Sequence, residues 1–285
     1  MTYITELLKA VIFGIIQGIT EWLPISSTGH LILANQFLML KQSEAFINLF
    51  LVVIQFGSIL AVVTLYFHKL NPFSPRKSKA GKNDTWRMWV RVLAAVIPTA
   101  IIGLIFDDII EKYLSTPLVV ALALIVYGIL FIIVERQRRE VKVTSIAEMS
   151  FKTAVIIGFC QALAIIPGTS RSGATILGAV LIGTSREVAA EFSFFLAIPV
   201  MFGASLLRCI KYFMEYGFGF ENGGGWILLV GTAVSYIVSV FAIRFLMGYI
   251  RKHDFTAFGY YRIILGALII LYFAFTGGLL TGMQV

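Results

Sequence analysis

The chain has 285 residues, of which 59% are hydrophobic and only 13% are charged, and its formal net charge is +8. A soluble domain of this length carries about a quarter charged residues, so these are too few to cover a globule's surface. The composition therefore excludes an ordinary soluble domain and predicts an integral membrane protein. The basic excess lies in a few loops, which indicates contact with membrane lipids and no binding of nucleic acid.

The first apolar stretch, residues 4–40, is long enough to enter a membrane but is interrupted midway by residues 24–30. The interruption combines proline, glycine and consecutive hydroxyl side chains, which do not continue a helix comfortably. Residues 151–183 show the same organisation, with a break at residues 167–173. In hydrocarbon, non-helical backbone is tolerated only where protein or a wet cavity satisfies it, so both breaks are expected inside the protein.

The remaining apolar runs are each about twenty residues long, the length of a transmembrane helix. They predict six transmembrane helices, at residues 45–68, 88–106, 117–134, 189–214, 226–247 and 262–277. The two cysteines, Cys160 and Cys209, fall in apolar runs and are expected to be small core residues without a disulfide.

Loop charges predict the orientation of these helices. Loops 69–87 and 135–149 and segment 248–256 are rich in lysine and arginine, whereas loops 107–116 and 215–224 are acidic. The positive-inside rule places the first three in the cytoplasm and the last two outside. Counting helices from these assignments, the first broken segment enters and leaves on the external side and the second on the cytoplasmic side. Each is thus expected to be a re-entrant hairpin.

The two broken segments also resemble each other in sequence. Residues 10–17 match residues 154–161, and each match leads to a proline and a hydroxyl-rich turn. A unit of one hairpin and three crossings has odd parity, so a second copy must be inverted, as the loop charges independently indicate. We therefore expect an all-α polytopic membrane protein with six transmembrane helices and two re-entrant broken-helix hairpins in an inverted-topology repeat. The chain is interpreted as a single membrane domain, residues 1–285, with repeats at about 1–134 and 151–280.

The first break carries candidate metal ligands. Gln17 and Glu21 are four residues apart and so lie on one helix face, and His30 follows the break. A carboxylate in a membrane segment costs several kcal/mol unless it is paired, hydrated or metal-bound, so Glu21 marks a functional site.

The second break supplies groups suited to an anion. Arg171 presents a rigid fork of donors that matches phosphate oxygens, and each restarting half-helix points its N-terminus at the site. Hydroxyl groups at the two breaks are the expected substrate-binding groups: Ser26, Thr28, Ser170, Ser172 and Thr175. Because Glu21 would repel a phosphate, a divalent cation held by Gln17 and Glu21 is expected between them.

Two motifs resemble the signatures of the bacterial undecaprenyl-diphosphate phosphatase family, which is known for bacitracin resistance. They are QGITEWLPISSTGH at residues 17–30 and PGTSRSGAT at residues 167–175. The resemblance covers essentially the whole chain. Many members have Glu where this chain has Gln17, which weakens the case for two carboxylates on the metal.

The resemblance implies hydrolysis of undecaprenyl diphosphate to undecaprenyl phosphate and inorganic phosphate, with a divalent cation, Mg or Ca, as cofactor. By motif position the catalytic group is Glu21, Ser27, His30 and Arg171. Whether Ser27, His30 or water is the nucleophile stays open; His30, three positions after Ser27, could reach it across one helical turn. The resemblance also implies a bacterial plasma membrane protein whose site faces outward and recycles the carrier lipid for peptidoglycan synthesis. The oligomeric state is open, a homodimer included.

Two alternatives belong to other classes of protein. A secondary transporter or flippase for a phosphorylated lipid or anion commonly has inverted repeats and broken helices. A membrane scaffold would leave Glu21, Ser27, His30 and Arg171 without a role. These four residues favour hydrolysis over both alternatives.

Overall fold

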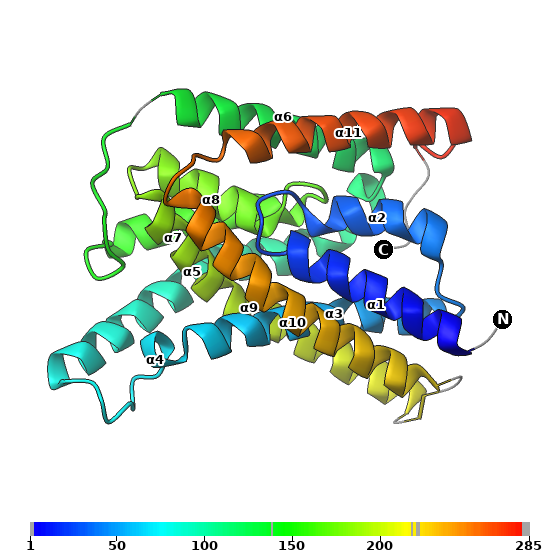
Figure 1. Cartoon of the computed structure of the whole chain (residues 1–285), viewed down its shortest axis with the longest axis horizontal. Coiled ribbons are helices and arrows are strands. Elements are labelled where there is room, and N and C mark those ends of the chain that lie inside the picture. Colours follow the sequence, from blue (N-terminus) through cyan, green and yellow to red (C-terminus); the bar gives the residue numbers. More distant parts are fainter. Residues whose placement is uncertain (1–2, 138, 218, 221–222, 281–285) are drawn as a thin grey trace.

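The structure is a computed structural model that describes residues 3–137, 139–217, 219–220 and 223–280, with the backbone alone described at 107–112. These residues fold into α-helices joined by short loops (Figure 1). In chain order the helices are α1 (Tyr3–Thr20), α2 (Ser27–Leu38), α3 (Glu44–Leu65), α4 (Phe67–Leu70), α5 (Lys79–Leu114), α6 (Pro117–Arg136), α7 (Phe151–Ala162), the 3₁₀ turn η1 (Leu163–Ile165), α8 (Arg171–Leu181), α9 (Arg186–Tyr216), α10 (Gly224–Ile250) and α11 (Thr256–Thr276).

The predicted all-α membrane architecture is confirmed. Seven helices in the described residues are long and apolar enough to cross a membrane. Six of them correspond to the six predicted spans: four contain the predicted span completely, α3 ends three residues before the predicted end at residue 68, and α11 ends one residue before the predicted end at residue 277. The seventh is α1, whose 18 residues form one arm of the first predicted hairpin.

Several predicted boundaries were wrong. Helix α5 continues to Leu114, so residues 107–114, predicted as an external loop, are helical. Charged residues have adequate helix propensity, and no proline follows Pro98 in this helix to end it earlier. The acidic side chains of Asp107, Asp108 and Glu111 lie outside the described residues. Helix α2 already begins at Ser27 and α8 at Arg171, because serines placed just before them cap both helices.

The first broken segment is a hairpin whose open end is held by polar contacts. Lys9 Nζ, on α1, donates to the carbonyl of Met39, just after α2, over 2.7 Å. The backbone N–H of Lys41 donates to Glu6 Oε2 over 2.8 Å. The beginning of α1 and the end of α2 therefore lie side by side, as expected of a re-entrant segment.

The second broken segment is a hairpin with its open end at the opposite end of the molecule. Arg139 and Val143, in the loop that leads into α7, donate to the carbonyls of Leu181 and Gly183 at the end of α8. Figure 1 shows α1 and α2 approaching the centre from the right-hand end of the view, while α7 and α8 approach from the left-hand end. The tips of the two hairpins meet in the middle.

The three basic loops gather at one end of the molecule. They surround a cavity of about 1070 Å³, lined by Lys69 and Lys77 from the first loop, Arg139 from the second and Arg251 from the third. The sequence expectation that these loops share one side of the membrane is thus supported by their common location. The cavity is not lined by any of the predicted site residues.

Glycines allow the hairpin arms to pack closely on long helices. A methyl group at Gly14 of α1 would lie 2.6 Å from the carbonyl oxygen of Gly231 on α10. A methyl group at Gly158 of α7 would lie 2.2 Å from the carbonyl oxygen of Ala95 on α5. Close approach of backbones at small residues is how helices associate where no hydrophobic effect drives them together. The two arms therefore dock in the same way, α1 on α10 and α7 on α5.

The two breaks share an unusual backbone conformation in a constant register. Ser26 and Ser170 are the non-glycine residues with positive φ in the described chain, at 73° and 70°. Each accepts a hydrogen bond on its Oγ from the backbone N–H three residues later, at Gly29 and Gly173. Ser26 and Ser170 are 144 residues apart in the sequence, as are Gly29 and Gly173, and as are Gln17 and Gln161 of the matching segments. The structural equivalence thus extends the sequence match through the breaks; the outer limits of the two repeats stay a prediction.

Candidate active site

The tips of the two hairpins are joined by direct hydrogen bonds. Ser172, in the first turn of α8, is buried, and its Oγ lies within donating distance of the carbonyls of Glu21 and Leu23, at 3.1 and 3.3 Å. These carbonyls belong to the turn that follows α1, where the Leu23 carbonyl also accepts from the backbone N–H of Ile25 at 2.7 Å. The second hairpin therefore adds a side-chain donor to the backbone of the first break.

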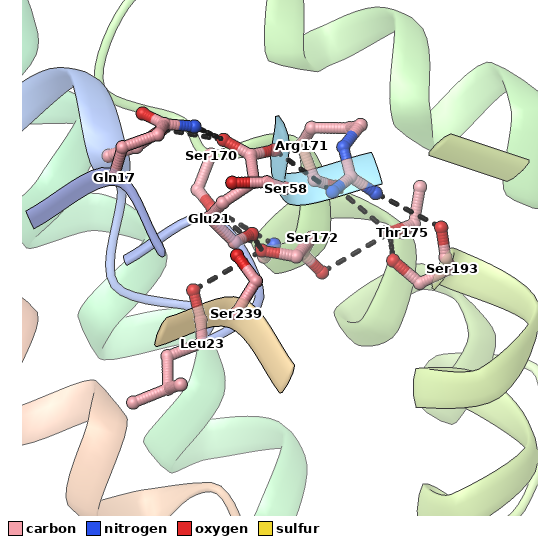
Figure 2. Close-up of polar contacts among 12 residues, drawn as sticks. Gln17, Glu21, Leu23, Ser58, Ser170, Arg171, Ser172, Thr175, Ser193 and Ser239 are labelled. Carbon is pink, nitrogen blue, oxygen red and sulfur yellow. Dashed lines mark hydrogen bonds and ion pairs between the residues drawn. The ribbon is translucent and has the colours of Figure 1, made fainter. Parts of the chain in front are cut away.

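Glu21 is the centre of the site (Figure 2). Its Oε2 accepts hydrogen bonds from Gln17 Nε2 at 2.9 Å and from Ser27 Oγ at 3.1 Å. Its Oε1 forms a salt bridge with an Nη of Arg171 at 3.0 Å. Glu21 is buried, with 7% of the residue exposed. Gln17, Glu21, Ser27 and Arg171, predicted from two distant motifs, are thus brought together at one carboxylate.

Arg171 is held on three sides. Beside its salt bridge, its other Nη donates to the carbonyl of Ser193 on α9, and the guanidinium lies 5.3 Å from the ring centre of Trp22. Its Nε is buried without a partner among the described residues. Removing one member of such a buried pair leaves an uncompensated charge, at a cost of about 3–5 kcal/mol. The pair therefore joins the two hairpins, and breaking it by removing one partner should be costly. The same two side chains are also available for chemistry at the site.

Most of the predicted substrate-binding hydroxyls have hydrogen bonds within the protein. Ser26 and Ser170 cap α2 and α8, and Ser172 joins the tips. Thr175 Oγ1 lies 2.6 Å from Ser193 Oγ and is buried. Thr28 is half-buried in the first turn of α2. Direct contact of these five hydroxyls with a substrate stays a prediction.

The hydrogen bonds of His30 go to groups outside the Glu21 cluster. Its Nδ1 is 2.7 Å from the carbonyl of Ser26, and its Nε2 is 2.6 Å from the hydroxyl of Tyr261 on α11. In the described residues no hydrogen bond joins His30 to Ser27, so the expectation that His30 reaches Ser27 across one turn is not met. The group that contacts Ser27 is Glu21.

Four residues of the site neighbourhood were missed in the sequence. Trp22 and Ser193 contact Arg171, Tyr261 contacts His30, and Arg262 contacts both breaks. Trp22 and Ser193 gave no signal, because aromatic and hydroxyl side chains are common in membrane helices. Arg262 did give one: an arginine inside an apolar helix is costly and marks function by default.

The donor set is chemically compatible with a hard divalent cation. Gln17 Oε1 is a buried acceptor without a partner, and it lies on the residue whose Nε2 contacts Glu21. An amide oxygen and a carboxylate are ligands that Mg²⁺ and Ca²⁺ prefer. The described residues contain no cluster of three or more histidine, cysteine or acidic side chains. The protein thus offers few ligands of its own, as is usual where substrate phosphates complete the shell of a magnesium ion.

Comparison with known proteins identifies the family of this chain. Residues 10–268 match the family model described as bacitracin resistance protein BacA. A protein of Streptococcus thermophilus named undecaprenyl-diphosphatase is 57% identical over 272 residues, covering 95% of this chain and 94% of its own length. One of the same name from Enterococcus faecalis is 56% identical, covering 95% and 99%. Undecaprenyl-diphosphatase 1 of Clostridioides difficile is 55% identical, covering 94% and 96%. At this identity and coverage, the chain belongs to the bacitracin resistance protein BacA family.

Proposed function

We propose that this protein hydrolyses undecaprenyl diphosphate to undecaprenyl phosphate and inorganic phosphate. The observation that carries the proposal is the meeting of Glu21 and Arg171 at the tips of two opposed hairpins. The names of the relatives, which state this activity of those proteins, give the substrate. A role in recycling the carrier lipid for the cell wall, and bacitracin resistance, follow from the same identity.

Arg171 is the proposed phosphate-binding group. Its guanidinium carries a buried Nε with no partner in the described residues, and its donor fork suits the oxygens of a terminal phosphate. The packed ring of Trp22 and the carbonyl of Ser193 fix the orientation of the fork. Rigid placement of this kind lets the guanidinium stabilise charge that develops on the phosphoryl oxygens in the transition state.

Glu21 and Ser27 are proposed to handle the nucleophile. In one route Ser27 Oγ attacks the terminal phosphorus while Glu21 accepts its proton; in the other, a water takes the place of Ser27. In both routes a new P–O bond forms, the bond from phosphorus to the bridging oxygen breaks, and undecaprenyl phosphate leaves. In the water route this step also gives inorganic phosphate. In the serine route the phosphate stays on Ser27 Oγ until a water attacks its phosphorus, which breaks the bond to Oγ, releases inorganic phosphate and returns a proton to Ser27. The 3.1 Å contact between Ser27 and Glu21 is compatible with both routes. His30, whose Nε2 lies 2.6 Å from the hydroxyl of Tyr261, is proposed to transfer a proton to or from the substrate at a point other than the Ser27–Glu21 contact.

Gln17 and Glu21 are proposed to hold a divalent cation, Mg or Ca. When bound, such an ion neutralises phosphate charge and allows a carboxylate and a diphosphate to share one site. The free Oε1 of Gln17 supports this assignment.

We further propose that the site opens to the external side of the bacterial plasma membrane. The hairpin that carries Glu21 begins and ends at the end of the molecule away from the basic loops (Figure 1). By the positive-inside rule the basic end is cytoplasmic.

A single assay tests the function. The purified protein in detergent, supplied with a polyprenyl diphosphate and Mg²⁺, is expected to release inorganic phosphate. Arg171→Ala and Glu21→Ala should lower the rate by about 100-fold or more, since each removes transition-state stabilisation. Arg244→Ala, at an exposed arginine on α10, is the matched control and should leave the rate unchanged. Wild-type protein that releases no phosphate but moves intact diphosphate across vesicles would instead support the transporter alternative.

A further inference from the structure

Arg262 is the most deeply buried charge in the described chain. It lies within the apolar helix α11 and is fully buried, with 0% exposure. No carboxylate among the described residues pairs with it; it is instead surrounded by carbonyl oxygens and by the ring of Tyr127, at 5.5 Å. Keeping a cation in such a place is expensive, so its contacts need an explanation.

The guanidinium binds the backbone of both breaks at once. One Nη donates to the carbonyl of Pro24 at 3.1 Å. The other Nη donates to the carbonyls of Gly168 at 3.0 Å and Thr169 at 2.9 Å. These carbonyls belong to non-helical backbone and have no helical partner of their own. Three donors of one planar fork thus connect two segments that are more than a hundred residues apart in the chain.

The contacts follow the internal symmetry of the fold. Pro24 and Gly168 are 144 residues apart, the same offset that relates Ser26 to Ser170. A single side chain can bind two equivalent carbonyls only if it lies between the two repeats. Helix α11 packs on α6 at this place, where Gly128 and Gly259 each lie against the other's carbonyl.

Among the residues that the structure describes, one arginine occupies this place at the interface of α6 and α11. Arg262 follows Gly259 by three positions, and the residue that follows Gly128 by three is the buried Phe131. Arg262 also lies against the first turn of α8: a methyl group at Gly173 would be 3.1 Å from its Nη1. Gly173 is two residues from Arg171. The guanidinium therefore contacts backbone close to both members of the Glu21–Arg171 pair.

We propose that Arg262 is a positioning residue for phosphate hydrolysis, which fixes the two breaks against each other and so sets Arg171 in place relative to Glu21. It does not touch the substrate; it acts through the carbonyls of the breaks. Lysine keeps the charge but is a point donor without a planar fork, so it cannot hold the same three carbonyls in one geometry. The proposal rests on the proposed phosphatase activity only for its kinetic readout.

The kinetic test compares Arg262→Lys and Arg262→Met with the matched control Arg244→Met. Misplacing catalytic groups by about 1 Å can cost on the order of 100-fold in rate. We therefore expect kcat for phosphate release to fall about 10-fold in the lysine variant and about 100-fold in the methionine variant. KM should stay within about threefold, because Arg262 does not bind the substrate.

The structural test measures the distance between the breaks directly and needs no activity. Ile19 on α1 and Leu163 in η1 are exposed at 40% and 52% and are also 144 residues apart. Spin labels on Ile19→Cys and Leu163→Cys, with Cys160 and Cys209 changed to alanine, report the separation of the hairpin tips. We expect one narrow distance distribution in wild type and Arg244→Met, and a broadened or shifted one in the Arg262 variants.

Distinct results would overturn the proposal. If both Arg262 variants keep the wild-type distance distribution, the residue does not position the breaks. If the distances change while kcat stays at the wild-type value, the positioning has no role in the reaction. A lowered melting temperature with unchanged kcat and distances would assign Arg262 to stability alone. Should Arg262→Met fail to fold, Arg262→Lys, which keeps the charge and most of the stem, decides the question. Wild-type protein without phosphatase activity would refute the proposed function and leave the distance test standing.

Discussion

The hydroxyl of Tyr261 lies 2.6 Å from Nε2 of His30, and the two rings are stacked at an interplanar angle of 8°. Nδ1 of His30 is 2.7 Å from the carbonyl of Ser26, which can only accept a hydrogen bond. In the neutral ring, Nδ1 must therefore carry the proton, and Nε2 accepts from Tyr261. The structure thus fixes the tautomer of a residue that is proposed to act in the reaction.

Removing this donor tests the link between His30 and catalysis. Tyr261→Phe keeps the stacked ring but loses the hydroxyl, so kcat is expected to fall by about 10-fold, a cost typical of losing a group that orients a functional histidine. Steady-state phosphate release measures it. The neighbouring Tyr260→Phe removes a hydroxyl from an exposed tyrosine and should have no effect. Equal rates for the two variants would show that Tyr261 has no part in the reaction.

The salt bridge between Glu21 and Arg171 predicts a loss of both activity and stability when its charge is removed. Glu21→Gln keeps the shape of the side chain but leaves Arg171 buried and uncompensated. We expect destabilisation by about 3–5 kcal/mol and an inactive protein. Thermal unfolding in detergent measures the first effect and phosphate release the second. A variant as stable as wild type would mean that Arg171 finds another partner.

Gln17 predicts a difference in metal affinity. Gln17→Glu adds a second carboxylate beside Glu21, so the Mg²⁺ concentration that gives half-maximal activity should fall. Gln17→Ala removes the free Oε1 and should raise that concentration, while excess chelator should abolish activity in every form. Titration of activity with Mg²⁺ provides the comparison. Identical titration curves for all three proteins would exclude residue 17 from the metal site.

Close packing of α7 on α5 predicts that Gly158 tolerates no side chain. A methyl group there would lie 2.2 Å from the carbonyl oxygen of Ala95, so Gly158→Ala must push the helices apart. Overpacking of this kind costs about 1–3 kcal/mol, which should lower the melting temperature clearly. Gly103→Ala, also on α5 but at a position where an added methyl group would meet nothing within 4 Å, is the control and should not lower it.

The sidedness of the molecule is tested by labelling single cysteines. Ala80 lies at the basic end of α5 and Gly219 in the opposite loop, and both are exposed. A membrane-impermeant maleimide added to intact cells should label Gly219→Cys and leave Ala80→Cys unlabelled until the cells are opened. The reverse pattern would place the Glu21 hairpin on the cytoplasmic side and refute the proposed external site.

The sequence by itself determined the membrane class, the spans and the two hairpins. These features depend on local properties: apolar length, helix-breaking residues and the charge of loops, each of which is visible along the chain. The same local signals misplaced the end of α5, because a change from apolar to acidic residues marks a membrane boundary without ending a helix. Gln17, Glu21 and Arg171 were also identifiable, since polar groups in apolar segments are rare enough to stand out. Ser27 was identified through the resemblance of its motif to the family signature.

Only the tertiary structure decided which of these groups meet and what holds them. Nothing in the sequence indicated that Ser27 contacts Glu21 while His30 turns toward Tyr261, because residues within one helical turn point in different directions and their partners come from distant helices. The contacts of Arg262 with Pro24 and Gly168 depend on two hairpins, distant in sequence, meeting at one place in space. An arginine in an apolar helix indicates from the sequence that a charge is buried at a cost. The carbonyls that compensate this charge come from distant parts of the chain, so they are brought together around it only by folding.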